Sequence, residues 1–160
     1  MSSRFNVDYR IGSLPRGKAA RLVLVGLSLL AGGQSAFAAD ITGVVSRIVD
    51  GDTLYVCTDV LCEKIRLCGI NAPERSDVGG SASTNELKAI AANQTLRCIP
   101  VGEGTICDGR SKPTSGDRIV AQCFVGKRDI AGMMVGRGQA CDWVKFSGGH
   151  YSRNRVGHTC

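Results

Sequence analysis

The chain has 160 residues, of which 43% are hydrophobic and 21% are charged, and its formal net charge is +6. This length predicts one domain preceded by a processed segment. Residues 1–38 hold five basic residues and one acidic residue, so residues 39–160 carry a net charge of only +2. The basic pI of the whole chain is therefore no evidence for a polyanionic partner.

Residues 1–38 have the features of a secretory signal peptide. Basic residues precede a short apolar run at 22–31, and Ala36-Phe37-Ala38 has the small residues of a cleavage site. The apolar run is well short of the roughly 20 residues that span a bilayer. We therefore expect cleavage before Ala39 and an exported protein, periplasmic or secreted, with no membrane attachment. Residues 39–160 would form the domain, ending in an irregular tail.

All of the cysteines follow this segment, and their even number predicts disulfides formed in an oxidising compartment. Zinc is the alternative, but zinc sites usually contain close C-x₂-C pairs, which are absent from the sequence. Local geometry suggests one disulfide across a hairpin, Cys57 with Cys62, and one between strands, Cys98 with Cys123. The eight cysteines are Cys57, Cys62, Cys68, Cys98, Cys107, Cys123, Cys141 and Cys160.

The first half of the expected domain consists of strands. Residues 41–49 are rich in β-branched side chains and predict a strand. Asp50-Gly51-Asp52 indicates a turn into a second strand at 53–57. Residues 63–68 alternate between polar and apolar side chains, as a third strand does, and Pro73 ends regular pairing.

A helix is expected at 83–96, where Ser83 would cap the first turn and Glu86 would complete a capping box. Short strands with one helix between the third and the fourth favour an α+β fold, a small five-stranded β-barrel of the OB-fold type. The other expected elements are a strand at 96–101, a polar loop at 102–116, a strand at 119–125 and a short helix at 129–135.

Acidic residues and an arginine are concentrated between Asp50 and Glu74. The predicted turns would place Asp52 and Glu74 at one end of the sheet, where carboxylate, amide and carbonyl oxygens suit a hard cation such as Ca²⁺. A glutamate there can act as a general base toward water, and Arg66 can bind a phosphate bidentately. By composition alone, an ordinary acidic turn with a surface ion pair is the better explanation of these residues.

Charge is also distributed unevenly along the expected domain. Residues 39–109 hold ten acidic and six basic residues, whereas residues 110–160 hold nine basic and three acidic ones. An acidic half can hold a cation and a basic half can bind a polyanion. Both halves could equally be ordinary solvated surface.

The chain contains the motifs Val49-Asp50-Gly51-Asp52-Thr53 and Ile65-Arg66-Leu67-Cys68-Gly69-Ile70-Asn71-Ala72-Pro73-Glu74. In order and spacing they resemble the signature of the staphylococcal nuclease (thermonuclease) family. The likeness continues through 117–123, 129–131 and 135–140, and so covers most of residues 41–140. It implies an OB-fold barrel that hydrolyses DNA and RNA with Ca²⁺ and leaves 3′-phosphate ends.

The resemblance also implies roles for individual residues around a calcium ion. Asp52 would bind Ca²⁺ directly, and the backbone carbonyl of Ala72 would be a further ligand. Asn71 stands where the family more often has a second aspartate. Because the amide is neutral, we expect weaker calcium binding than with an aspartate at this position.

Three residues would carry the catalytic chemistry that the resemblance implies. Glu74 would be the general base, and Arg66 and Arg118 would bind the phosphate and stabilise charge in the transition state. Gly116-Asp117-Arg118 departs from the Tyr-Gly-Arg usual in the family, and Asp117 could compete for Arg118 or face away. The long final helix of the family is not evident, and a disulfide could hold 141–160 instead.

Aromatic and basic residues alternate near the end of the chain. Trp143, Lys145 and Tyr151 are candidates for substrate binding, because aromatic rings stack on bases and cations follow phosphates. Core packing of Trp143 and Phe146 is an equal alternative. The main hypothesis is thus a monomeric nuclease whose partner is its DNA or RNA substrate. The rivals are a non-catalytic OB-fold nucleic-acid-binding module and a disulfide-rich inhibitor or adhesion protein.

Overall fold

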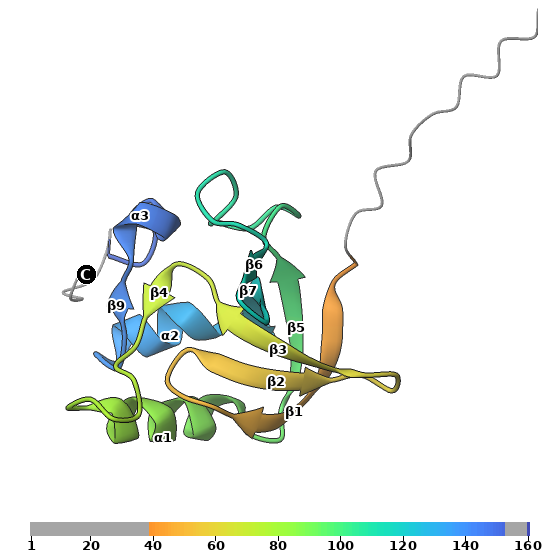
Figure 1. The fold of residues 1–160 in the computed structure, drawn as a ribbon, viewed down its shortest axis with the longest axis horizontal. Helices are drawn as coiled ribbons and strands as arrows, with labels where there is room; N and C mark the ends of the chain where they lie inside the picture. The colour runs from red at the N-terminus through yellow and green to blue at the C-terminus, as the bar shows by residue number, and fades with distance from the viewer. Residues whose placement is uncertain (1–38, 153–159) are drawn as a thin grey trace, which may run out of the picture. The chain divides into compact units, whose positions relative to one another are not determined.

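A closed β-barrel forms the centre of the computed structural model, which describes residues 39–152 and Cys160. Neighbouring strands pair antiparallel around the barrel, and a parallel pairing of β3 with β7 closes it (Figure 1). The predicted five-stranded OB-type α+β fold is confirmed, while the predicted signal peptide lies outside the described residues. The barrel strands are β1 Ile41–Ile48, β2 Thr53–Cys57, β3 Cys62–Leu67, β5 Thr95–Pro100 and β7 Arg118–Val125.

Strand β1 bends so that it can pair with β2 on one edge and with β5 on the other. Val44 has Cys57 as its partner in β2 and Thr95 as its partner in β5, and the register with β2 shifts between Val45 and Arg47. Such a bulge increases the local twist of a strand, which helps a small sheet to close. Gly43 permits the close approach, because a Cβ there would lie 2.3 Å from the carbonyl oxygen of Cys57.

Short strands and helices surround the barrel, and several of them contribute residues to the candidate site. In α2, the Asp129 side chain caps the helix by accepting hydrogen bonds from the backbone N–H groups of Ala131 and Gly132. These elements are β4 Ile70–Asn71, α1 Gly80–Ala91, β6 Thr114–Ser115, β8 Arg128–Asp129, α2 Ile130–Gly136, β9 Cys141–Asp142 and α3 Val144–Ser147.

Helix α1 begins and ends earlier than the predicted 83–96. Ser83 is not its cap: the residue is buried inside the helix, and its hydroxyl donates to the carbonyl of Gln139 at 2.6 Å. Asn93 adopts a positive φ of 61° just beyond the helix, and Leu96 is fully buried in β5. The local capping signal was overridden by a tertiary contact, and the strand needs Leu96 for the core.

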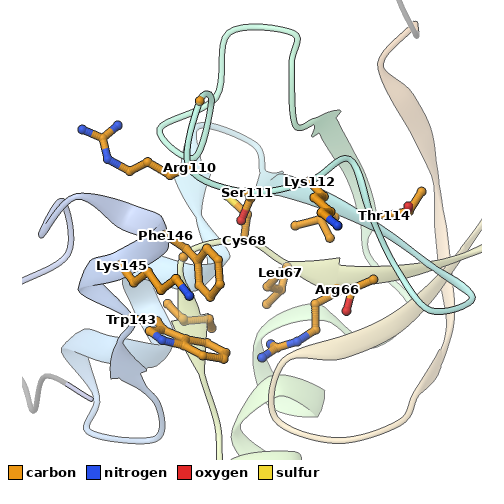
Figure 2. Close-up of a pocket in the computed structure, with 15 residues that line it drawn as sticks. Arg66, Leu67, Cys68, Arg110, Ser111, Lys112, Thr114, Trp143, Lys145 and Phe146 are labelled. Carbon is orange, nitrogen blue, oxygen red and sulfur yellow. The ribbon is translucent and has the colours of Figure 1, made fainter.

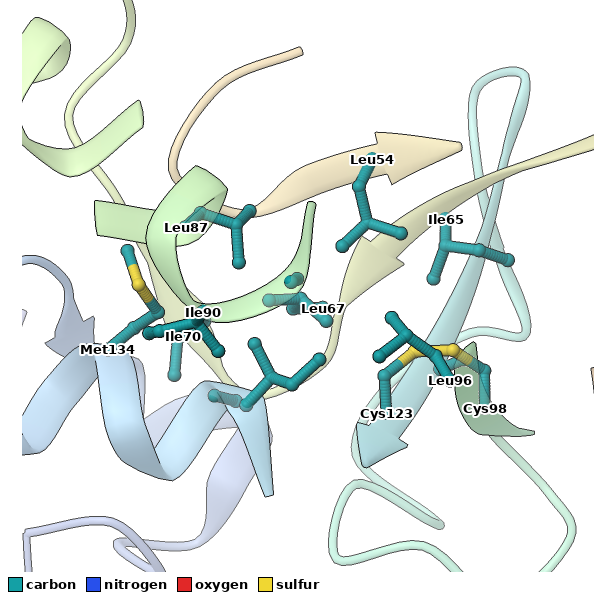
Figure 3. Packing of buried hydrophobic residues seen from close by; sticks show 14 of the residues in the cluster. Leu54, Ile65, Leu67, Ile70, Leu87, Ile90, Leu96, Cys98, Cys123 and Met134 are labelled. Atoms are coloured by element: carbon teal, nitrogen blue, oxygen red, sulfur yellow. A yellow bond between two sulfur atoms is a disulfide. The ribbon is translucent and has the colours of Figure 1, made fainter. Parts of the chain in front are cut away.

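The core fills the barrel and continues under α1 and α2. Figure 3 shows Leu54 and Ile65 on barrel strands and Leu87 and Met134 on the helices, and all four are fully buried. The disulfide Cys98–Cys123 crosses from β5 to β7 within this core. A fully buried aliphatic side chain of this size contributes about 1.5–3 kcal/mol, so the core holds the site's frame in place.

Four disulfides pair all eight cysteines. The two pairs expected from local geometry are confirmed, and so is a bridge that holds the segment from Cys141 to Cys160. Cys68–Cys107 ties the polar loop to the end of β3. Four disulfides indicate an oxidising environment, as for an exported protein. In the described residues, no helix has the length and apolar character needed to cross a membrane.

Candidate active site

Asp52 lies at the junction of the β1–β2 turn with the end of β3. Its backbone N–H donates to Oδ1 of Asp50 at 3.0 Å, and its carbonyl accepts from the N–H of Leu67 at 2.8 Å. The side chain is nearly inaccessible, with the residue 5% exposed. The turn predicted from Asp50-Gly51-Asp52 therefore fixes one carboxylate against the strand that carries Arg66.

Several groups hold the Asp52 carboxylate. Oδ2 accepts from the N–H of Ala72 at 2.8 Å and pairs with the Arg66 guanidinium, and Oδ1 accepts from the Thr53 hydroxyl at 3.1 Å. Burial raises the pKa of Asp52 to about 6, although Arg66 and the Ala72 N–H act in the opposite direction. Burial therefore destabilises the charged form of Asp52, and a further cation nearby would stabilise it.

Arg66 connects this carboxylate to the second candidate ligand. Its Nη2 donates to Oδ1 of Asn71 at 3.2 Å, so one guanidinium contacts side-chain oxygens of both Asp52 and Asn71. The Arg66 side chain is 12% exposed. The structure therefore brings together four of the predicted residues, namely Asp52, Arg66, Asn71 and Ala72.

The donor set suits a hard cation but carries little charge. Among residues 39–152 and Cys160, no group of three or more His, Cys, Asp or Glu side chains could hold a metal. The available donors are the Asp52 carboxylate, the Asn71 amide oxygen and backbone carbonyls, which are the oxygen types that Ca²⁺ prefers. Oxygens of these types fit a hard cation, which would compete with Arg66 for the two side-chain oxygens that the guanidinium now contacts.

Glu74 lies on the exposed turn that follows Ala72 and Pro73. Its backbone N–H donates to Oδ2 of Asp77 at 3.1 Å, and its carbonyl accepts from the Asp77 N–H at 2.9 Å. Its side chain is solvent-exposed. Glu74 follows Ala72 by two residues, and water can reach its exposed carboxylate.

Arg118 is the first residue of β7, and its side chain reaches the end of the barrel that holds Asp52. Nε donates to the carbonyl of Ser115 at 3.1 Å, Nη2 to the Ser115 hydroxyl at 3.1 Å, and Nη1 to the Thr53 hydroxyl at 3.4 Å. The Thr53 hydroxyl in turn donates to Asp52. Arg118 is therefore linked to the Asp52 cluster through one hydroxyl.

Asp117 does not take Arg118 out of the site. Its exposed carboxylate forms an ion pair with Lys64 at 2.9 Å. Hydrogen bonding by Lys64 lowers the pKa of Asp117 below its ordinary value. Of the two orientations that the sequence left open for Asp117, the structure has the one that faces away from Arg118, and the carboxylate pairs with Lys64.

A basic hollow of about 630 Å³ opens beside Arg66. Its described lining contains four basic side chains, Arg66, Arg110, Lys112 and Lys145, and no acidic one (Figure 2). Trp143 and Phe146 form an aromatic wall, with ring centroids 4.7 Å apart in an edge-to-face arrangement. Two of the predicted substrate-binding residues, Trp143 and Lys145, thus lie in one hollow with Arg66.

The sequence prediction missed Arg110 and Lys112. They lie in the polar loop at 102–116, which Cys68–Cys107 fastens to the end of β3. Figure 2 shows this loop facing the α3 segment across the hollow. The only sequence signal was the excess of basic residues after position 109, which does not identify the residues that meet in space.

Tyr151 is not part of this hollow. The residue is 6% exposed, and its hydroxyl donates to Oδ2 of Asp129 at 3.0 Å. Burial raises the pKa of Tyr151 far above its ordinary value. A ring packed in the core cannot stack on a substrate base, so the proposed binding role of Tyr151 is corrected to a structural one.

A buried aspartate anchors the tail that positions Trp143 and Lys145. Asp142 is fully buried, and its carboxylate accepts from the Ser147 hydroxyl and from the Ser152 N–H. Its carbonyl accepts from the N–H of Cys160 at 3.1 Å. These bonds and the Cys141–Cys160 bridge hold α3 beside the β4–β9 pair.

Comparison with known proteins gives a partial match. No protein-family model matches the chain. Two curated proteins, one from Escherichia coli O157:H7 and one from Escherichia coli, are each named "Uncharacterized endonuclease" and are 41% identical over 58 residues. The match covers 36% of this chain and 38% of each relative. It supports a relation to nucleases in general and does not single out the staphylococcal nuclease family.

Proposed function

We propose that the protein is an exported, calcium-dependent nuclease that hydrolyses phosphodiester bonds of DNA and RNA. The observation that carries the proposal is the position of Arg66. Its guanidinium contacts the oxygens of Asp52 and Asn71 and also lines the basic, aromatic hollow. A phosphate bound there would lie between a cation-binding cluster and a pocket for its nucleotide. The endonuclease relatives support the same class of reaction.

The Asp52 carboxylate, the Asn71 amide oxygen and the Ala72 carbonyl would hold calcium. When bound, the ion would supply positive charge next to the reacting phosphate. Calcium at Oδ2 of Asp52 and Oδ1 of Asn71 would compete with the Arg66 guanidinium for these oxygens, because like charges repel at contact distance. Once displaced, the guanidinium can face the hollow that it already lines.

The remaining residues would divide the chemistry of hydrolysis. Arg66 and Arg118 bind the phosphate oxygens and stabilise the charge that builds as water attacks phosphorus. Glu74, whose side chain is exposed, accepts the proton of the attacking water. The new bond joins the water oxygen to phosphorus, and the bond from phosphorus to the 5′ oxygen breaks, which leaves a 3′-phosphate end.

The basic hollow would hold the nucleotide attached to that phosphate. Trp143 can stack on a base, and Arg110, Lys112 and Lys145 attract the backbone charge. Its volume of about 630 Å³ lies in the range of small-molecule pockets.

Digestion by the full, disulfide-bonded protein tests this proposal. We expect single-stranded DNA and RNA to be cut in millimolar calcium, to remain intact in excess chelator, and to yield 3′-phosphate ends. Failure to cut either polymer in calcium would contradict the proposal.

Two observations favour a second function, a non-catalytic OB-fold module that binds nucleic acid. The neutral Asn71 and the contacts of Arg66 with both candidate ligands weaken the cation site. Such a module would bind an oligonucleotide equally well with and without chelator and would cut nothing. The calcium dependence of binding and cleavage therefore separates the two functions.

A further inference from the structure

A second hollow, of about 520 Å³, is lined by Asn71, the residue whose side-chain oxygen accepts from Arg66. Arg66 lines the basic hollow and Asn71 lines the second one, and the described linings have no residue in common. The two-stranded β4–β9 pair joins them: Ile70 lines the first hollow, and Asn71 and Cys141, which are partners in the pair, line the second.

The two hollows differ in chemistry. Among its described lining residues the second hollow has no basic side chain, and its one carboxylate, Asp77, accepts the Glu74 N–H. Pro73 and Val78 supply apolar surface, and Val78 is wholly exposed, at 101%. Gln139 adds an amide that can both donate and accept. This surface suits the flat, uncharged base of a nucleoside better than it suits a phosphate.

The position of the second hollow gives it a natural occupant. A phosphodiester inside a strand has a nucleoside on each side, and a strand whose phosphate lies at Arg66 can extend past Asn71 into the second hollow. We propose that the second hollow binds the nucleoside on the leaving side of the scissile phosphate. This inference rests on the proposed function and makes the site a two-sided one, as cutting within a strand requires.

Binding in chelator, with the full disulfide-bonded protein, tests the subsite without depending on cleavage. The probes are a nucleoside 3′,5′-bisphosphate, which can fill the basic hollow alone, and a dinucleotide, which can fill both. The variants Val78→Tyr and Val78→Ser change the stacking surface and leave the charge unchanged. Val60→Tyr and Val60→Ser are the matched controls, because Val60 is also exposed, at 87%, in the turn between β2 and β3.

We expect Val78→Tyr to tighten dinucleotide binding about fivefold or more, as an added stacking ring does, and Val78→Ser to weaken it. Affinity for the bisphosphate should stay within about twofold in every variant, and the Val60 variants should leave both ligands unaffected. Equal effects on both ligands, or none on the dinucleotide, would overturn the subsite. Val78 effects confined to the dinucleotide, in a protein that cuts no polymer, would overturn the nuclease and leave the second hollow as a nucleoside-binding site only.

Discussion

The buried charge of Asp52 should make the stability of the metal-free protein depend on pH. The pKa of Asp52 rises from 3.8 to about 6 on folding, and burial is the largest cause. A tenfold change in proton affinity corresponds to about 1.4 kcal/mol, so the charged carboxylate costs the folded state about 3 kcal/mol at neutral pH. Because the folded pKa is the higher one, protonated Asp52 favours the folded state. This contribution to stability is fully present below pH 3.8 and is lost as the pH rises through about 6.

Urea unfolding in chelator at several pH values between 3.5 and 7.5 measures this effect. Asp52→Asn is the reference, because its side chain is neutral throughout, as protonated Asp52 is. We expect the wild-type free energy of unfolding to fall by about 3 kcal/mol relative to Asp52→Asn across this range. Saturating calcium should remove most of the fall by pairing with the charged form. A difference that stays constant, or that grows in favour of the wild type as the pH rises, would refute the reasoning.

Three further outcomes are expected from the site geometry. Asn71→Asp adds a carboxylate and should tighten calcium binding about tenfold in calorimetry; unchanged affinity would show that this position is not a ligand. Arg110→Ala combined with Lys112→Ala should raise KM severalfold and reduce the salt dependence of binding, with kcat little changed. Tyr151→Phe loses a hydrogen bond to Asp129 and should lower the free energy of unfolding by about 2 kcal/mol, while KM stays unchanged; a raised KM would restore its binding role.

Local patterns were sufficient to predict the barrel strands. The alternation in β3 and the turn at Asp50-Gly51-Asp52 are short-range features, and so is the bridge between Cys57 and Cys62. The cluster of Asp52 with Arg66 was also expected, because turn and strand order place both at one end of the sheet. These contacts lie close in sequence or follow directly from strand pairing.

Contacts between distant segments could not be predicted in the same way. Ser83 looked like a helix cap because its partner, the carbonyl of Gln139, is 56 residues away. Tyr151 looked like a surface aromatic because its bond to Asp129 depends on how the tail folds back. Arg110 lines the basic hollow because Cys68–Cys107 ties its loop to β3. That disulfide could not be predicted, because eight cysteines allow about 105 pairings.

The most direct test of the central claim is single-turnover cleavage by Glu74→Gln in saturating calcium. The matched control is Glu63→Gln, which makes the same change in β3, in a strand position assigned no catalytic role. The account predicts that Glu74→Gln slows cleavage at least a hundredfold while oligonucleotide affinity stays within about twofold, because it removes a base and no phosphate contact. Cleavage by Glu74→Gln at the rate of the wild type and of Glu63→Gln would contradict it.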